Sequence, residues 1–180
     1  MKHLRLLFTL FFAATGASAL ISQDSGKTQI LEVVATTYNI SRIETLVYLR
    51  VYSDGSAEAH PMRKIDFRNL DLKHAQLSAS EITSLREFLT PARTEKWDDK
   101  YERFWGCKDC GSAWEIVVGQ GKEKKTVALT NFQPFLAREQ KKPYPADIEK
   151  LGCIIWEQRA RVVNEPYDMD YLSGCKSIGY

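Results

Sequence analysis

An alternation of apolar and polar positions over residues 43–52 is the clearest regular pattern in this chain, and it predicts a β-strand. It places the following side chains on one face of the strand: Ile43, Thr45, Val47, Leu49 and Val51. The preceding residues 29–37 are rich in β-branched side chains, which also favour a strand. The first regular structure in the chain is therefore expected to be β-sheet.

The residues that follow this strand, Ser53-Asp54-Gly55, are typical of a β-hairpin turn. Two registers compete. A two-residue turn places Glu58 opposite Val51, on the apolar face. A three-residue loop, with Gly55 in the left-handed conformation, puts alanines there instead and brings Arg50 opposite Glu58. We predict the three-residue loop, because only this register keeps one face apolar and pairs opposite charges across the strands.

A helix is predicted to begin directly after Ser78. Ser78 and Glu81 have the spacing of a capping box, in which each side chain accepts a hydrogen bond from the backbone N–H of the other residue. Pro91 marks the end of this helix. The apolar positions behind the cap recur with helical spacing: Ile82, Leu85, Phe88 and Leu89.

A second hairpin and a second helix follow the first pair. Residues 114–118 and 124–132 are predicted to be strands joined by a glycine-rich turn. Four apolar side chains can share one face of this hairpin: Ile116, Val118, Val127 and Leu129. Pro145 suits the first turn of the second helix, and Pro166 ends it. Its buried stripe is expected to be Ile148, Leu151, Ile155 and Trp156.

The order hairpin, helix, hairpin, helix predicts an α+β fold. We expect two ββα units that form an antiparallel sheet with two helices packed on one face. Residues 92–112 show no regular period and are expected to form an ordered loop. The chain is predicted to fold as a single globular domain over residues 20–166, followed by a C-terminal tail over residues 167–180.

Residues 1–19 are predicted to be a signal peptide. Lys2 and Arg5 form a short positive region, Leu6–Ala14 is apolar apart from one threonine, and Ala17-Ser18-Ala19 is a typical cleavage site. The apolar run is shorter than the roughly 20 residues that a membrane-spanning helix needs. We therefore expect cleavage after Ala19, secreted or periplasmic localisation, and no stable membrane anchor after cleavage.

Composition and charge narrow the class of protein. The 180 residues are 44% hydrophobic and 11% aromatic, so the chain can build a core and is not expected to be disordered. Loss of Lys2 and Arg5 with the signal peptide leaves 23 basic residues against 23 acidic ones. This balance gives no general attraction to nucleic acid, which is not expected as a partner.

The four cysteines of the chain are candidates for redox activity, structural disulfides or zinc binding. Cys107 and Cys110 have C-x-x-C spacing, which occurs in redox-active pairs. However, a strand rather than a helix is predicted after them, so a structural disulfide is favoured. We favour the pairing Cys107–Cys110 with Cys153–Cys175, which ties the tail to the second helix; other connectivities stay open. Zinc binding is disfavoured by the cysteine spacing and by the oxidising compartment.

Residues for catalysis are scarce. Without its signal peptide the chain has two histidines, His60 and His74, and it contains neither a G-x-S-x-G nor an H-E-x-x-H motif. Surface or hairpin-edge positions are favoured for both histidines. We therefore predict no catalytic residue, no cofactor and no metal site.

An aromatic-rich segment offers the one candidate binding surface in the sequence. Its aromatic and acidic side chains can line a polar–aromatic groove for a peptide or a sugar, although burial of the aromatic rings in the core is favoured. The residues of this surface are Trp97, Asp98, Asp99, Tyr101, Glu102, Phe104 and Trp105.

Turn and core motifs give the chain a resemblance to a broader group. The succession of Val51–Gly55, Ser80-Glu81-Ile82, Trp114-Glu115-Ile116 and Tyr144-Pro145 resembles small secreted bacterial α+β domains of uncharacterised function, over about residues 43–160. The resemblance implies an exported α+β domain and brings no catalytic residues with it.

Together these features predict an exported, non-enzymatic binding module whose partner is a protein, a peptide or a component of the cell envelope. The alternative hypothesis is a thiol–disulfide redox protein that uses Cys107 and Cys110. Its reduction potential would separate the two, because structural disulfides lie below about −300 mV.

Overall fold

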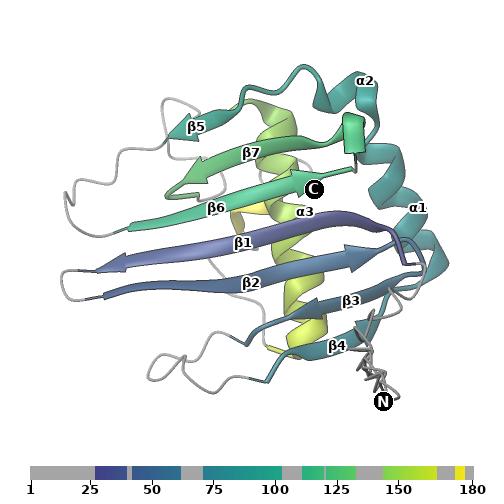
Figure 1. The fold of residues 1–180 in the computed structure, drawn as a ribbon, viewed down its shortest axis with the longest axis horizontal. Coiled ribbons are helices and arrows are strands. Elements are labelled where there is room, and N and C mark those ends of the chain that lie inside the picture. The colour runs from purple at the N-terminus through teal and green to yellow at the C-terminus, as the bar shows by residue number, and fades with distance from the viewer. Residues whose placement is uncertain are drawn as a thin grey trace, which may run out of the picture.

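A computed structural model describes residues 27–39, 42–61, 71–102, 111–119, 121–132, 144–165 and 173–176. Seven strands form one sheet: β1 (Gln29–Asn39), β2 (Arg42–Tyr52), β3 (Ser56–Ala59), β4 (Lys73–Gln76), β5 (Lys100–Glu102), β6 (Gly111–Val118) and β7 (Lys125–Thr130). The helices are α1 (Ala79–Phe88), α2 (Pro91–Thr94) and α3 (Ala146–Val163), with a 3₁₀ turn over Gly121–Glu123. Figure 1 shows α3 behind the sheet, crossing its strands, with α1 near one end of them.

The strands lie in the order β4-β3-β2-β1-β6-β7-β5. All neighbouring pairs are antiparallel except β5 and β7, which are parallel, so the sheet is mixed. On the face opposite α3, the described residues contribute no helix (Figure 1). The sheet therefore has one face packed on α3 and one face formed by strands alone, within the described part of the chain.

The predicted architecture of two ββα units with an antiparallel sheet is wrong. β1, which belongs to neither predicted hairpin, lies between them and pairs with β2 on one side and with β6 on the other. β4 adds a further strand before α1, and β5 adds a parallel strand at the far edge. The loop expected over residues 92–112 instead contains α2, β5 and the start of β6. Among the described helices α3 alone is long, with 18 residues.

The continuous apolar face predicted for β2 is also wrong. Val33 pairs with Leu49 and Val34 pairs with Val47, so the chain has an extra residue at Tyr48. Such a bulge moves the residues beyond it to the other face of the sheet. Leu49 is accordingly buried, whereas Ile43 is 70% exposed.

The predicted register of the β2–β3 hairpin is confirmed. Arg50 pairs with Glu58 across β2 and β3, and Gly55 has φ +85° in the turn between them. A Cβ at Gly55 would lie 2.6 Å from the Gln76 side chain, so this turn requires glycine. In the second hairpin Ile116 pairs with Val127, and both are fully buried.

The capping box of α1 is confirmed as well. The Glu81 N–H donates to the Ser78 hydroxyl, and the Ser78 N–H donates to the Glu81 carboxylate. Ile82, Leu85 and Phe88 are buried, as their helical spacing predicts. The cap therefore fixes where α1 begins and which of its faces turns to the core.

The core lies between the sheet and α3. Its fully buried members include Leu31, Leu49, Ile116, Leu129, Ile148, Leu151 and Ile155. The rings of Tyr48, Trp114, Phe132 and Tyr144 form a chain with neighbouring centroids 4.6, 5.1 and 5.4 Å apart. A Cβ at Gly152 would lie 2.0 Å from the Phe132 ring, so α3 approaches this aromatic chain closely only because glycine occupies that position.

Arg159 fixes the C-terminal half of α3 to β2. Its guanidinium lies 4.7 Å from the Tyr48 ring centroid, donates to the His60 carbonyl at 3.0 Å and pairs with Glu165 at 2.9 Å. Arg159 is only 5% exposed. Removing one of these partners should be strongly destabilising, because it would leave the buried guanidinium charge incompletely paired.

A disulfide joins Cys153, in α3, to Cys175 in the short helical turn of residues 173–176. This is the pairing favoured from the sequence, and both cysteines are buried. No helix among the described residues is long and apolar enough to cross a membrane.

Candidate functional site

The binding surface expected from the sequence is divided between core and edge. Trp97 is 5% exposed and packs on Phe88, with 6.2 Å between ring centroids, so it belongs to the core. Asp98 and Asp99 are exposed directly before β5, Glu102 is exposed at the end of β5, and the Asp98 N–H donates to the Tyr101 hydroxyl. Phe104 and Trp105 lie outside the described residues.

The structure describes two of the four cysteines and both of the histidines considered above. Cys107 and Cys110 lie outside the described residues, whereas Cys153 and Cys175 are paired. His74 is exposed, and its Nδ1 lies 3.6 Å from the Glu58 carboxylate across β3 and β4. The described residues contain no group of three potential metal ligands.

A row of charged side chains crosses β1, β2 and β3 on the face opposite α3. Arg50 lies 2.5 Å from a Glu32 oxygen on one side and 2.5 Å from a Glu58 oxygen on the other. The Tyr52 hydroxyl donates to the same Glu58 oxygen at 2.9 Å. Burial disfavours the guanidinium charge, but these hydrogen bonds outweigh it and hold the pKa of Arg50 above its ordinary value.

A hollow of about 560 Å³ lies beside this row, over β3 and β4. Tyr52 lines it, and burial together with its hydrogen bond to Glu58 raises the pKa of the phenol. Lys27 pairs with Asp54, and Gln76 donates to the Asp54 carbonyl. Polar groups here are thus already engaged with one another, which favours a structural role in joining β1, β2, β3 and β4.

A larger groove of about 620 Å³ lies between α1 and α3. Two helical stripes face each other across it, and α2 contributes one residue at its end. The groove is lined by Ser80, Glu81, Ser84, Leu85, Glu87, Phe88, Arg93, Lys150, Ile154, Glu157, Gln158 and Arg161. The apolar members, Leu85, Phe88 and Ile154, belong to the core or pack against it, so they form an apolar floor.

Ion pairs join the helices near each end of this groove. At one end Arg161 contacts Glu81 of α1 and also lies 2.7 Å from Glu157. A hydrogen bond from the Ser78 hydroxyl is the main cause that lowers the pKa of Glu81, against the effect of burial. At the other end Arg93 lies 3.8 Å from Asp147, at the start of α3.

Two cations lie over the same aromatic ring at this second end. The Arg93 guanidinium is 4.5 Å from the Phe88 ring centroid, and the Lys150 ammonium is 5.9 Å from it. Unlike Arg93, Lys150 has no carboxylate within 4.0 Å among the described residues. Within the described part of the chain, the groove therefore presents an ammonium without a paired carboxylate beside an apolar floor.

The groove residues of α3 form a regular pattern in the sequence. Lys150, Ile154, Glu157 and Arg161 recur with helical spacing along α3 and form a stripe separate from the buried one. A charged stripe of this kind is ordinarily interpreted as a solvated helix face. Nothing in the local pattern shows that a second helix lies opposite.

No protein-family model matches the chain, and no curated protein matches it.

Proposed function

We propose that this protein is an exported, non-enzymatic binding module that holds a small ligand in the groove between α1 and α3. The observation that carries the proposal is the Lys150 ammonium, which has no paired carboxylate among the described residues and lies beside the floor formed by Leu85, Phe88 and Ile154. Ligand sites typically combine such an apolar floor with a few polar groups that orient the ligand.

The size and construction of the groove support this function. Its volume of about 620 Å³ falls within the roughly 300–1,000 Å³ of small-molecule sites. The Arg161–Glu81 pair connects α3 to α1 across the groove, and the Arg93–Asp147 pair connects α2 to the start of α3. A groove bounded in this way is formed before the ligand arrives, which reduces the entropy cost of binding.

The chemistry of the walls favours binding over catalysis. Nucleophilic catalysis by a hydroxyl needs a base within hydrogen-bond reach. Ser84, on the wall of the groove, makes no hydrogen bond or ion pair through its side chain with any described residue. Lys150, which has no carboxylate within 4.0 Å in the described part of the chain, instead suits recognition of an anionic group.

Export is the second part of the proposal. It rests on the signal-peptide pattern of residues 1–19 and is supported by the buried Cys153–Cys175 disulfide, since disulfides persist mainly in oxidising compartments. An exported binding module of this size would meet small molecules of the cell envelope or of the surroundings. We therefore expect the ligand to come from that pool.

The proposal is tested by amide NMR of residues 20–180 with a panel of sugars, organic acids, amino acids and short peptides. We expect one class of compound to shift resonances of α1 and α3 around Ser84 and Lys150. Ser84→Trp fills the groove and should abolish these shifts. Thr83→Trp, at the adjacent exposed position outside the groove, is the matched control and should retain them. Shifts that survive Ser84→Trp, or none in the groove with any compound, would contradict the proposal.

A further inference from the structure

We infer that the α1–α3 groove binds an acidic sugar, a uronic acid, at its end near Arg93 and Lys150. This inference rests on the binding function proposed above and names the ligand class of the same site. It is carried by the ammonium, carboxylate and hydroxyl groups that line this end and form no hydrogen bond or ion pair with the described residues.

Lys150 and Arg93 supply the positive groups at this end. Lys150 has no carboxylate within 4.0 Å in the described part of the chain. Arg93 donates through Nη1 to the Phe88 carbonyl at 3.2 Å, and its Nε lies 3.8 Å from Asp147, so Nη2 is left without an acceptor among the described residues. The Arg93–Asp147 pair is itself weak, because both side chains are more than one third exposed. The carboxylate of the ligand is therefore assigned to Lys150, with Arg93 beside it.

Ser84 and Glu87 supply the polar groups of α1 that line the groove. They lie three positions apart, so their side chains are neighbours on the surface of the helix. Neither side chain makes a hydrogen bond or an ion pair with any described residue. An ionised carboxylate only accepts hydrogen bonds, whereas a hydroxyl both donates and accepts. Both positions therefore match hydroxyl groups of a ligand.

The Glu87 carboxylate argues against a plain organic acid as the ligand. It repels an anion held at Lys150. A ligand that covered Glu87 without donating to it would also remove water from the carboxylate and leave it unpaired. A ligand that presents a carboxylate to Lys150 and hydroxyls to Glu87 avoids this cost. A uronic acid carries one carboxylate and several hydroxyls on a single compact ring, so it meets both requirements.

The small exposed area of the floor also favours a hydroxylated ligand over an apolar one. Leu85 and Phe88 are only 4% and 6% exposed. The Phe88 ring is covered by two cations, with the Arg93 guanidinium 4.5 Å and the Lys150 ammonium 5.9 Å from its centroid. An apolar ligand would gain little here, because its gain scales with the apolar area removed from water. Recognition at this end is therefore set by the polar groups.

The test titrates residues 20–180 with glucuronate and galacturonate and follows the amide resonances by NMR. Matched compounds remove one feature each: the corresponding uronamides lack the charged carboxylate, and cyclohexanecarboxylate lacks the hydroxyls. We expect both uronates to shift resonances around Ser84, Glu87 and Lys150. Each matched compound should bind about tenfold more weakly, because charge-assisted hydrogen bonds are lost.

Two variants assign these interactions to residues, and the amide spectrum of each shows whether the fold is kept. In Lys150→Gln the uronates should lose affinity and the uronamides should not. In Glu87→Ala the uronates should bind about threefold to tenfold more weakly, whereas cyclohexanecarboxylate should bind no more weakly, because a repulsive charge is gone. Lys122→Gln and Glu95→Ala remove like charges at exposed positions outside the groove, and both should behave as the parent protein.

The outcomes separate this inference from the proposed function. If other compounds of the panel occupy the groove and neither uronate does, the acidic-sugar inference is wrong while the binding function stands. Equal affinity for the uronates and cyclohexanecarboxylate, or tighter binding of the uronates by Glu87→Ala, would show a site for a plain anion and overturn the inference. If no compound binds in the groove, the proposed function fails and the inference fails with it.

Discussion

At the scale of single residues, the β2–β3 turn shows how a few atoms connect distant parts of the chain. The Asp54 carboxylate accepts hydrogen bonds from the Ser56 N–H at 2.9 Å and from the Ser56 hydroxyl at 2.6 Å. It also pairs with Lys27, before β1, at 3.1 Å. The Leu77 N–H donates to the Gly55 carbonyl, so the turn also fixes the chain between β4 and α1.

Gly55→Ala should destabilise the protein by about 1 kcal/mol or more. The residue has φ +85°, and a Cβ would lie 2.6 Å from the Gln76 amide and 3.0 Å from the Leu77 carbonyl. The midpoint of urea unfolding measures the effect. Gly121→Ala is the matched control, because Gly121 also has positive φ but no atom within 4 Å of a built Cβ. An equal loss in both variants would show that contacts at Gly55 contribute nothing.

Asp54 should make stability depend on pH in the acid range. Hydrogen bonds from Ser56, together with Lys27, lower the pKa of Asp54 to about 2. A carboxyl whose pKa is lower in the folded state contributes stability that is present above its unfolded pKa, near 4, and is lost as pH falls through about 2.

The free energy of unfolding of Asp54→Asn, followed from pH 6 to pH 2, measures this contribution. The difference from the parent protein should be constant above about pH 5 and shrink between about pH 4 and pH 2. Ser56→Ala removes one donor and should move this loss to higher pH. A difference that does not change with pH would contradict the assignment.

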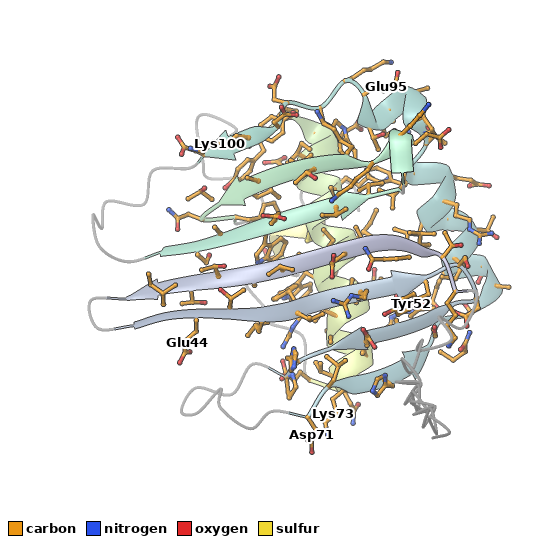
Figure 2. All side chains as sticks on the ribbon, in the orientation of Figure 1. Glu44, Tyr52, Asp71, Lys73, Glu95 and Lys100 are labelled. Carbon is orange, nitrogen blue, oxygen red and sulfur yellow. A yellow bond between two sulfur atoms is a disulfide. The ribbon has the colours of Figure 1, made fainter. Side chains whose placement is uncertain are left out.

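At the scale of elements, the two edge strands of the sheet carry features that discourage pairing with other chains. The edge strands β4 and β5 have four and three residues. Figure 2 shows Lys73 and Lys100 at the two opposite margins of the sheet. Short edge strands with charged side chains discourage pairing with a strand of another chain.

Ser78→Ala should cost about 1 kcal/mol, because it removes the hydroxyl that accepts the Glu81 N–H. Thr83→Ala, at an exposed position inside α1, is the control and should change stability by no more than about 0.5 kcal/mol. Far-UV circular dichroism during urea unfolding measures both. A loss in Ser78→Ala no larger than in Thr83→Ala would contradict the role of the cap.

Sequence patterns predicted those elements whose determinants lie close together in the chain. The β2–β3 register follows from Arg50 and Glu58, and the start of α1 follows from Ser78 and Glu81. The bulge at Tyr48 could not be predicted, because the alternation runs through it without interruption. β5 is three residues long and pairs with a strand that comes later in the chain, so its position depends on tertiary contacts.

At the scale of the whole molecule, the groove depends on how α1 and α3 are placed relative to each other, which local sequence patterns do not specify. Each of its walls is a recognisable helical stripe, and the capping box even fixes where the α1 stripe begins. That these stripes face each other depends on how α3 crosses the sheet, with Gly152 allowing it to approach Phe132. The candidate surface predicted from the sequence was instead based on aromatic residues. One of them, Trp97, is buried in the core.

The proposed export predicts which residue begins the processed protein. Protein recovered from the compartment to which the chain is delivered should begin at Leu20, because Ala17-Ser18-Ala19 is the cleavage site expected after the apolar region. Intact-mass analysis of the purified protein measures this directly. Recovery of the chain with Met1 in a membrane fraction would show that the N-terminal segment acts as an anchor.

The Cys153–Cys175 disulfide should contribute more to the stability of the whole molecule than a Cys107–Cys110 pair. Its cysteines are 22 positions apart and connect α3 to the turn of residues 173–176. Closing a loop of this length lowers the entropy of the unfolded chain, so Cys153→Ala with Cys175→Ala should cost about 2–4 kcal/mol.

Cys107→Ala with Cys110→Ala is the comparison. It should cost less and leave the fold intact, because loop-closure entropy grows with the length of the loop. Urea unfolding under non-reducing conditions measures both double variants, and peptide mapping without reduction gives the connectivity. A larger loss for the Cys107 and Cys110 variant would overturn this ranking. A free thiol of low pKa at Cys107 would instead favour the redox hypothesis, since thiolate character is what makes such a pair reactive.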